Sequence, residues 1–484
     1  MSLSGVVRSL RRVRAVNAVI LLGLTFYSLS LTLFPRIWNH WPLRSHYYYE
    51  NKGLLWPPGW NALPLALTLA GLLVLTWKRR KATLGVLLLL LTCAVSLQWA
   101  LSFLDGLNAK RLSSTLLAKQ YGHSEFVRRA YDEPQPLNFA RHYEARCAAA
   151  EPRSYIQTKP PGQLLFYSIA AELYRLFPVQ APCEWLAAHA GFEQRDPFTG
   201  LGAFTTILFS IVSCLPVVVL SWLGTRIEEN GNGLYYGLAF LLCPASTLIT
   251  MHLDQVLYPL CVSLALLAAV LALHKHVAFG ALAAGFAYGS IYLSFSLAFL
   301  VPTIGLWWAV HFCLRPDLRQ KILLVGLWFA LGALACYAAF RWGLGFEVAH
   351  AYRRAMEHHA AWRDTAGLVG ASGSIRNFVE AAFWLGVPAA VLCGAQWIRS
   401  ARAVLRGSAE PFALFVLLYP LIVLGVSTFG HATREIGRLW IPLLIPAQLA
   451  VAREMNQVYG ARPTAFVLFS SLAILLRKNF HDFR

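Results

Sequence analysis

The chain has 484 residues, of which 57% are hydrophobic and only 13% charged, and its formal net charge is +19. Soluble proteins carry roughly 25% charged residues, so this chain has too few solvated side chains to cover a soluble globular domain. Together with a mean hydropathy of +0.52, the composition predicts an all-α polytopic membrane protein. Basic residues accumulate in the cytoplasmic loops of such proteins, so the positive charge does not require nucleic acid as a partner.

Thirteen apolar segments have about the length that crosses a hydrocarbon core of roughly 30 Å. They lie at 17–35, 61–77, 83–104, 203–225, 233–250, 256–273, 276–295, 297–313, 321–341, 376–398, 411–428, 438–452 and 464–476. This spacing predicts about 13 transmembrane helices in three regions. The regions are 1–104 with three N-terminal transmembrane helices, 105–202 as a large extracytoplasmic loop with interfacial helices, and 203–484 as a bundle of about ten helices.

The orientation follows from the basic clusters at 78–81, 315–321 and 399–406. Segment 162–177 is apolar but short and contains Glu172 and Arg175. If it crossed the membrane, the last two clusters would face outward, against the positive-inside rule. We therefore predict an interfacial amphipathic helix there, with the C-terminal residues 477–484 outside. The N-terminal arginines precede a long apolar run without a small-residue cleavage site, which predicts a retained first span rather than a signal peptide.

Acidic residues at the ends of spans are the first candidates for function, because ionisable groups at membrane depth are costly. Asp105 directly follows the third span, and Asp254 lies between two spans on the same predicted outer face with Tyr258 one turn later. The alternative for Asp105 is a solvated helix terminus, and for Asp254 an ordinary loop aspartate.

The outer loop contains further polar and sulfur-bearing side chains. Asp132 and Glu133 are adjacent and precede a proline, a pattern more typical of a helix terminus than of a paired catalytic site. Cys147 and Cys183 both lie in this loop, where an oxidising compartment would allow a disulfide, although two unrelated thiols stay an alternative. The spacing of cysteines and histidines does not match a zinc site, so no metal site is predicted.

Basic residues also occur on the predicted outer face. Lys159 precedes two prolines and a glycine, whose restricted backbone would hold the lysine in place at the membrane surface. Two arginines, a histidine and a glutamate stand just ahead of a late span: His431, Arg434, Glu435 and Arg438. Arginines are disfavoured on this side, so the pattern indicates an anionic ligand such as a lipid phosphate, or else a local ion pair at a helix start.

These stretches together resemble the GT-C superfamily of polyprenyl-phosphate-sugar-dependent glycosyltransferases, which includes aminoarabinose transferases, protein O-mannosyltransferases and lipid-A galacturonosyltransferase-like enzymes. The matching stretches are FLDG at 103–106, TKPPG at 158–162, LDQVLY at 253–258 and REIGRLW at 434–440. Many members have a paired acidic motif after the first span, whereas Asp105 stands alone after the third.

The resemblance implies a role for each matching position. Asp105 would be the general base for an acceptor hydroxyl, with Asp132 or Glu133 as substitutes. Lys159, Arg434 and Arg438 would bind the donor phosphate, and Asp254, Tyr258, His431 and Glu435 would line the cavity. The co-substrate would be a lipid-linked sugar, and a need for a divalent cation stays open.

The implied activity is inverting transfer of a hexose or pentose from a polyprenyl-phosphate donor to a lipid, glycan or protein hydroxyl on the extracytoplasmic face of a bacterial inner membrane. Two other classes stay as alternatives. A secondary transporter would show two halves with matching interrupted helices and charged residues at the membrane midplane, and the sequence indicates neither. The second is a non-catalytic protein of envelope assembly.

Overall fold

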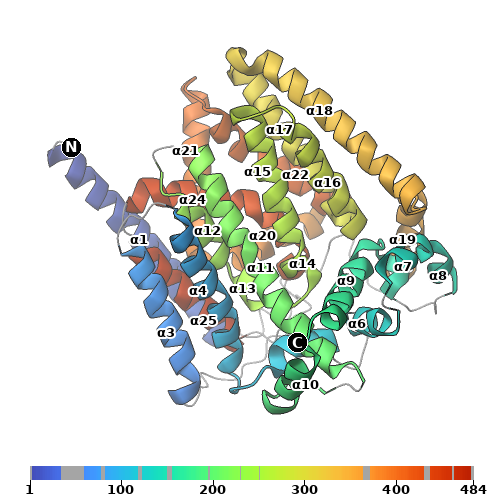
Figure 1. Ribbon diagram of the computed structural model, residues 1–484. Coiled ribbons are helices and arrows are strands. Elements are labelled where there is room, and N and C mark those ends of the chain that lie inside the picture. Colours follow the sequence, from blue (N-terminus) through green and yellow to red (C-terminus); the bar gives the residue numbers. More distant parts are fainter. Residues whose placement is uncertain are drawn as a thin grey trace.

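The computed structural model describes residues 3–33, 59–77, 82–117, 123–133, 135–149, 155–194, 197–228, 231–249, 251–363, 371–429, 436–460 and 463–480. Within these ranges every regular element is a helix, and the predicted all-α class is confirmed. Figure 1 shows a bundle of long helices with a group of short helices gathered at its lower end.

Three helices form the N-terminal region: α1 (Leu3–Leu33), α3 (Gly59–Thr76) and α4 (Leu84–Phe103). The apolar run of α4 has 20 residues, which corresponds to about 30 Å of helix and so to one crossing of a membrane. Helices α3 and α4 pack against each other, while α1 packs against α21 (Val387–Leu405) and α25 (Thr464–Phe480). The chain therefore brings its two terminal regions together.

The predicted outer loop folds into short helices at the lower end of the bundle (Figure 1). They are α5 (Lys110–Leu117), α6 (His123–Asp132), α7 (Pro136–Arg141), α8 (Tyr143–Ala149), the 3₁₀ helix η1 (Tyr155–Thr158), α9 (Gly162–Leu176) and α10 (Gln180–His189). Helix α9 has only 15 residues and packs against α6 and α11. It is not among the described helices that are long and apolar enough to span a membrane, and its interfacial position stays a prediction.

The remaining helices build the bundle around α11, which packs against α4, α12 and α15. In chain order they are α11 (Thr199–Ile227), α12 (Leu234–Leu241), α13 (Pro244–Leu248), α14 (Leu253–Val256), α15 (Tyr258–His274), α16 (Phe279–Leu293), η2 (Phe295–Phe299), α17 (Leu300–Leu314), η3 (Pro316–Leu318), α18 (Arg319–Ala338), the π-helical η4 (Ala339–Gly343), α19 (Val348–Arg363), α20 (Ala371–Leu385), α21, α22 (Pro411–Phe429), α23 (Ile436–Leu439), η5 (Pro442–Leu444), α24 (Ile445–Tyr459) and α25.

Seven described helices are long and apolar enough to cross a membrane, or eight if one bent pair counts as a single span. The predicted number of 13 is not confirmed, because several apolar runs are interrupted. The run at 233–250 breaks between α12 and α13, and the run at 438–452 is divided among α23, η5 and α24. Prolines begin α13 and η5, and they explain these breaks because a proline nitrogen cannot donate a helical hydrogen bond. The chain is nevertheless a multi-pass protein by the length and apolarity of these helices.

The bent pair joins α20 to α21 at an angle of 112°. Gly386 stands at the bend with a φ of +91°, which favours glycine. A Cβ atom at this residue would also lie 2.9 Å from Cδ of Pro244. The structure thus contains an interrupted helix, and the sequence-based expectation of uninterrupted spans was wrong at this point.

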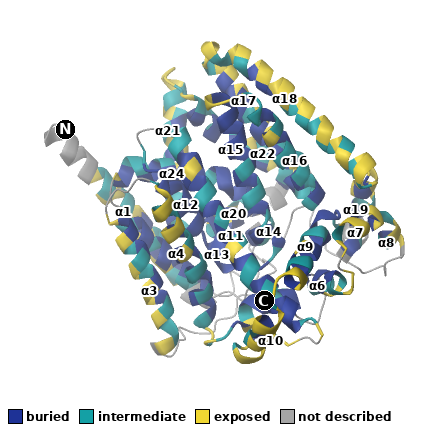
Figure 2. Cartoon of the chain, in the orientation of Figure 1, coloured by how far each residue is buried: buried dark blue, intermediate teal, exposed yellow. Residues whose placement is uncertain are grey.

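Helix α18 shows how the outer surface of the bundle meets its surroundings. Leucines along this helix are exposed, including Leu323 (65%), Leu327 (56%) and Leu334 (62%), and Figure 2 shows α18 as mostly exposed. Soluble proteins rarely expose a continuous apolar surface of this extent. Lipid contact accounts for it.

Two of the basic clusters that set the predicted orientation lie at one end of the bundle. Basic residues at the start of α18 and the end of α21 share the upper end with the beginning of α1, whereas the short helices α5–α10 occupy the lower end (Figure 1). Residues 78–81 lie outside the described part of the chain. Which end faces the cytoplasm stays a prediction from the positive-inside rule.

Candidate functional site

A buried ion pair stands at the lower end of the bundle, between α14 and α23. The Nε atom of Arg438 lies 3.6 Å from Oδ2 of Asp254, and the two side chains are only 12% and 7% exposed. Removing such charges from water is costly unless they are paired. The charge of Lys159 lies near this pair as well, because Lys159 and Arg438 both lower the pKa values of His123 and His252. Three predicted site residues, Lys159, Asp254 and Arg438, therefore share one region.

Two histidines complete this polar cluster. His252 precedes α14 with its Nδ1 3.3 Å from Nη1 of Arg438. His123, the first residue of α6, places its ring centroid 4.9 Å from that of His252. The Nδ1 atom of His123 lies 2.8 Å from the hydroxyl of Tyr167 on α9. The cluster therefore joins α6, α9, α14 and α23, which are far apart in the sequence.

Both imidazoles are held in the neutral form. Burial, together with the positive charges of Arg438 and Lys159, lowers the pKa of His123 to about 3. Burial and the charges of Arg438, His123 and Lys159 likewise lower the pKa of His252. Burial, the larger cause, disfavours a charge of either sign, whereas the positive charges of Arg438 and Lys159 repel a cation and attract an anion. The two cationic side chains, and not the pKa shifts themselves, are what suits the cluster to an anion.

This shift predicts how stability depends on pH. The unfolded chain takes up a proton on His123 near pH 6.5, whereas the folded protein does so only near pH 3. Stability should therefore decrease as the pH falls below about 6.5, by up to about 1.4 kcal/mol per pH unit from this residue. A His123→Gln variant, which can still hydrogen-bond Tyr167, should show a shallower decrease between pH 6.5 and 4.5 in thermal unfolding of the detergent-solubilised protein. Identical pH dependence in both proteins would contradict a neutral His123.

The segment around Lys159 is fixed by contacts of its backbone. The hydroxyl of Tyr143 donates to the carbonyl oxygens of Ile156 (2.6 Å) and Lys159 (2.5 Å). Gly162 begins α9 against the backbone of Tyr292, where a Cβ atom would lie 2.5 Å from its carbonyl oxygen. The glycine of the KPPG stretch is thus required by this close approach. The backbone of Lys159 is thus held in a fixed turn directly before α9.

Tyr258, a predicted cavity residue, is buried beside α9. Its hydroxyl accepts a hydrogen bond from Nε2 of Gln163, and both residues are at most 3% exposed. The Oε1 atom of Gln163 is buried and has no hydrogen-bond partner among the described residues. A buried acceptor without a partner is costly, so this atom could accept a hydroxyl hydrogen of a ligand.

Asp105 does not belong to the cluster. Its Oδ2 lies 2.5 Å from Nη1 of Arg111, and its Oδ1 accepts a hydrogen bond of 2.6 Å from Nζ of Lys478 on α25. Burial alone would raise the pKa of Asp105, but the charges of Arg111 and Lys478 outweigh it and lower the pKa. The carboxylate is therefore ionised at neutral pH. The pairing also accounts for cations at the C-terminal end of α25, which sequence reasoning did not connect to Asp105.

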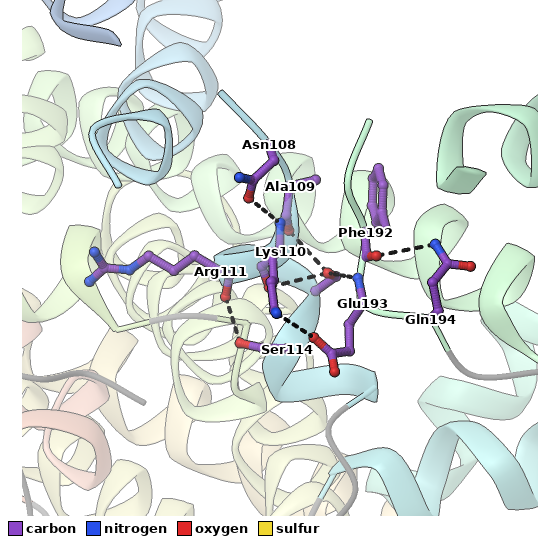
Figure 3. A network of polar contacts seen from close by, with 9 residues as sticks. Asn108, Ala109, Lys110, Arg111, Ser114, Phe192, Glu193 and Gln194 are labelled. Carbon is purple, nitrogen blue, oxygen red and sulfur yellow. Dashed lines mark hydrogen bonds and ion pairs between the residues drawn. The ribbon is translucent and has the colours of Figure 1, made fainter. Parts of the chain in front are cut away.

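The segment after Asp105 is held by a second polar network, shown in Figure 3. The backbone nitrogen of Glu193 donates to Oγ of Ser113 (3.0 Å), and Ala109 donates to the carbonyl of Ala190 (2.9 Å). Nζ of Lys110 lies 3.9 Å from the Glu193 carboxylate. The Arg111 side chain points away from this network in Figure 3. These contacts fix α5, so that Arg111 is directed toward Asp105.

A narrow cavity of about 10 Å³ lies between Asp105's partner Arg111 and the connection that leads into α14. Its lining includes Ser102 at the end of α4 and Gln255 on α14. The Ser102 Oγ and Gln255 Oε1 atoms are buried and lack hydrogen-bond partners among the described residues. The volume accommodates about one water, and these two atoms would bind it.

The other predicted residues lie elsewhere. Asp132 is exposed at the end of α6, and Glu133 forms an ion pair with Arg146. Cys147 and Cys183 are both buried free thiols, so the predicted disulfide is not formed. The reason is that α8 packs with η1, whereas α10 packs on α11. His431, Arg434 and Glu435 lie outside the described residues.

Sequence reasoning missed several members of the site. His252 directly precedes the LDQVLY stretch, and its position beside Asp254 was the only signal for it. His123, Tyr167 and Gln163 carried no spacing signal. No group of three or more His, Cys, Asp or Glu side chains that could hold a metal occurs within the described ranges.

Comparison with models of known protein families, with curated proteins and with solved structures finds no match for this chain. Any functional conclusion therefore depends on the chemistry of the site itself.

Proposed function

We propose that this chain is an integral-membrane glycosyltransferase that moves a sugar from a polyprenyl-phosphate donor to a hydroxyl of an envelope lipid, glycan or protein. The observation that carries the proposal is the buried cluster in which Arg438 and Lys159 act on two neutral histidines. Such a cluster favours a phosphate. Its place at one end of a membrane bundle suits a phosphate that carries a lipid chain.

The proposed reaction forms a bond between the acceptor oxygen and the anomeric carbon and breaks the bond between that carbon and the phosphate oxygen. The acceptor proton passes to the carboxylate of Asp105, which its two cations keep ionised. Arg438 and Lys159 stabilise the negative charge that develops on the departing polyprenyl phosphate. The buried acceptor atoms of Gln163 and Gln255 would bind sugar hydroxyls.

Asp105 and the cluster around Asp254 and Arg438 are separate, so a sugar must find room between them. Arg111, which binds Asp105, and Gln255, which neighbours Asp254, line a cavity of only about 10 Å³. A sugar needs far more room than one water. Donor binding must therefore move α5 away from the connection between α13 and α14.

The proposal is tested with the purified protein in vesicles that contain synthetic polyprenyl-phosphate sugars, labelled in the sugar, and an envelope extract as acceptor. We expect label in the acceptor fraction and free polyprenyl phosphate as the second product. Transfer from a nucleotide sugar alone, or no covalent transfer from any polyprenyl-phosphate donor in the panel, would contradict the proposal.

The 112° bend between α20 and α21 favours a second candidate, a secondary transporter, because transporters place substrate sites at interrupted helices. The same vesicles distinguish the two. Movement of a labelled solute across the bilayer without a covalent product would support transport.

A further inference from the structure

A second pocket lies at the other end of the bundle, near the beginning of α1. It has a volume of about 550 Å³, within the range of small-molecule sites. Its wall combines α1, α21 and α24, and its charged lining consists of Arg12, Arg399, Arg402, Arg406 and Glu454. Four arginines therefore face one hollow that the proposed sugar transfer does not use.

A buried carboxylate organises two of these arginines. Glu454 is 1% exposed, and its Oε1 accepts hydrogen bonds from Nη2 of Arg12 (2.7 Å) and Nη2 of Arg399 (2.9 Å). One glutamate neutralises only one of the four positive charges. The Nε atom of Arg399 is also buried without a hydrogen-bond partner among the described residues. The Arg399 guanidinium, held in place by Glu454, therefore still has an N–H group that can donate a hydrogen bond.

The other two arginines are not neutralised. Arg402 and Arg406 are exposed and make no ion pair within the described part of the chain. Arg402 lies in the last turn of α21 and Arg406 follows its last residue, so the two like charges stand four positions apart and repel each other. An anion between them would relieve this repulsion. The pocket also has an apolar side formed by Val16, Ala395 and Ile398.

We propose that this pocket binds a phosphate group through Arg399, Arg402 and Arg406, with the Glu454 carboxylate holding Arg12 and Arg399 in place. Guanidinium groups bind phosphate in a bidentate manner. Basic pockets between transmembrane helices bind the head groups of anionic lipids. The phosphate belongs either to such a lipid, whose chain contacts the apolar side, or to a soluble molecule.

The test uses the full chain in a neutral detergent and two probes, short-chain phosphatidylglycerol and inorganic phosphate. Binding is measured by the increase in thermal unfolding midpoint with probe concentration. The pocket variant is Arg402→Gln/Arg406→Gln. The control variant is Arg315→Gln/Arg319→Gln, which removes the same charge at the same end of the bundle, from exposed residues outside the pocket.

We expect the dissociation constant of the bound probe to rise about thirtyfold in the pocket variant and by less than about threefold in the control. Should the double variant be unstable, Arg406→Gln alone should show about a fivefold rise. Binding of phosphatidylglycerol without competition by inorganic phosphate identifies a lipid head group, and effective competition identifies a soluble phosphate. Equal weakening in the pocket and control variants, or binding of neither probe to the wild-type protein, would overturn the proposal. Since no sugar transfer is measured, the outcome is independent of the proposed enzyme activity.

Discussion

An Asp105→Asn variant should lose about 10²- to 10⁴-fold in kcat for sugar transfer while it still binds the polyprenyl-phosphate donor. Asparagine keeps an oxygen that can accept the hydrogen bond from Lys478, but it cannot take the proton of the acceptor hydroxyl. The side chain of Asp105 is 52% exposed, so the substitution should leave the fold intact. The measurement is single-turnover transfer together with donor binding at equilibrium.

Two further variants show whether a loss of transfer activity is specific to Asp105. Asp317→Asn removes an exposed carboxylate at the opposite end of the bundle and should leave transfer unchanged. Asp132→Asn tests the substitute base at the end of α6. If Asp105→Asn keeps full transfer activity and Asp132→Asn loses it, Asp132 is the general base. If both variants keep full activity, neither carboxylate accepts the proton of the acceptor hydroxyl.

Neutralising the buried pair with Arg438→Gln/Asp254→Asn should lower kcat about 10²- to 10³-fold, because a cation at the departing phosphate is lost. The single Arg438→Gln variant leaves the Asp254 carboxylate buried at 7% exposure without its partner. Breaking a buried pair in this way costs about 3–5 kcal/mol, so the single variant should be less stable than the double variant. Thermal unfolding and transfer kinetics of both variants separate the two effects.

Arg438→Lys is the conservative comparison. It keeps the positive charge beside Asp254 but removes the planar arrangement of donors that matches a phosphate. We expect near-normal stability and an intermediate loss of kcat. A double variant that transfers sugar at the wild-type rate would show that Arg438 does not contact the donor phosphate.

The local features of the fold could be predicted, because hydropathy and length act within single segments. The apolar run of α4 and the short amphipathic α9 illustrate this. The breaks could not be predicted in the same way. Apolar residues continue on both sides of Gly386, so the sequence reads as one run although the backbone turns by 112°.

Some members of the candidate site could be predicted from the sequence and others could not, for a related reason. Lys159, Asp254 and Arg438 stood out because charges near a membrane are costly. A single histidine carries no such signal, and His123 and His252 are neutral because of neighbours that only the folded chain supplies. The prediction of a Cys147–Cys183 disulfide was wrong for the same reason. Two cysteines in one loop need not come together, because the loop does not determine which helices pack against each other.

The contact between Lys478 and Asp105 also has a consequence for biosynthesis. The two residues are 373 positions apart, and ribosomes add about 5–20 residues per second. Asp105 therefore waits about 20 to 75 s for its second cation while the intervening helices enter the membrane. During that interval Arg111 is present but Lys478 is not, so Asp105 has one of its two cations. The surroundings of Asp105 can therefore reach their final arrangement only after α25, one of the last helices to be synthesised, has packed into place.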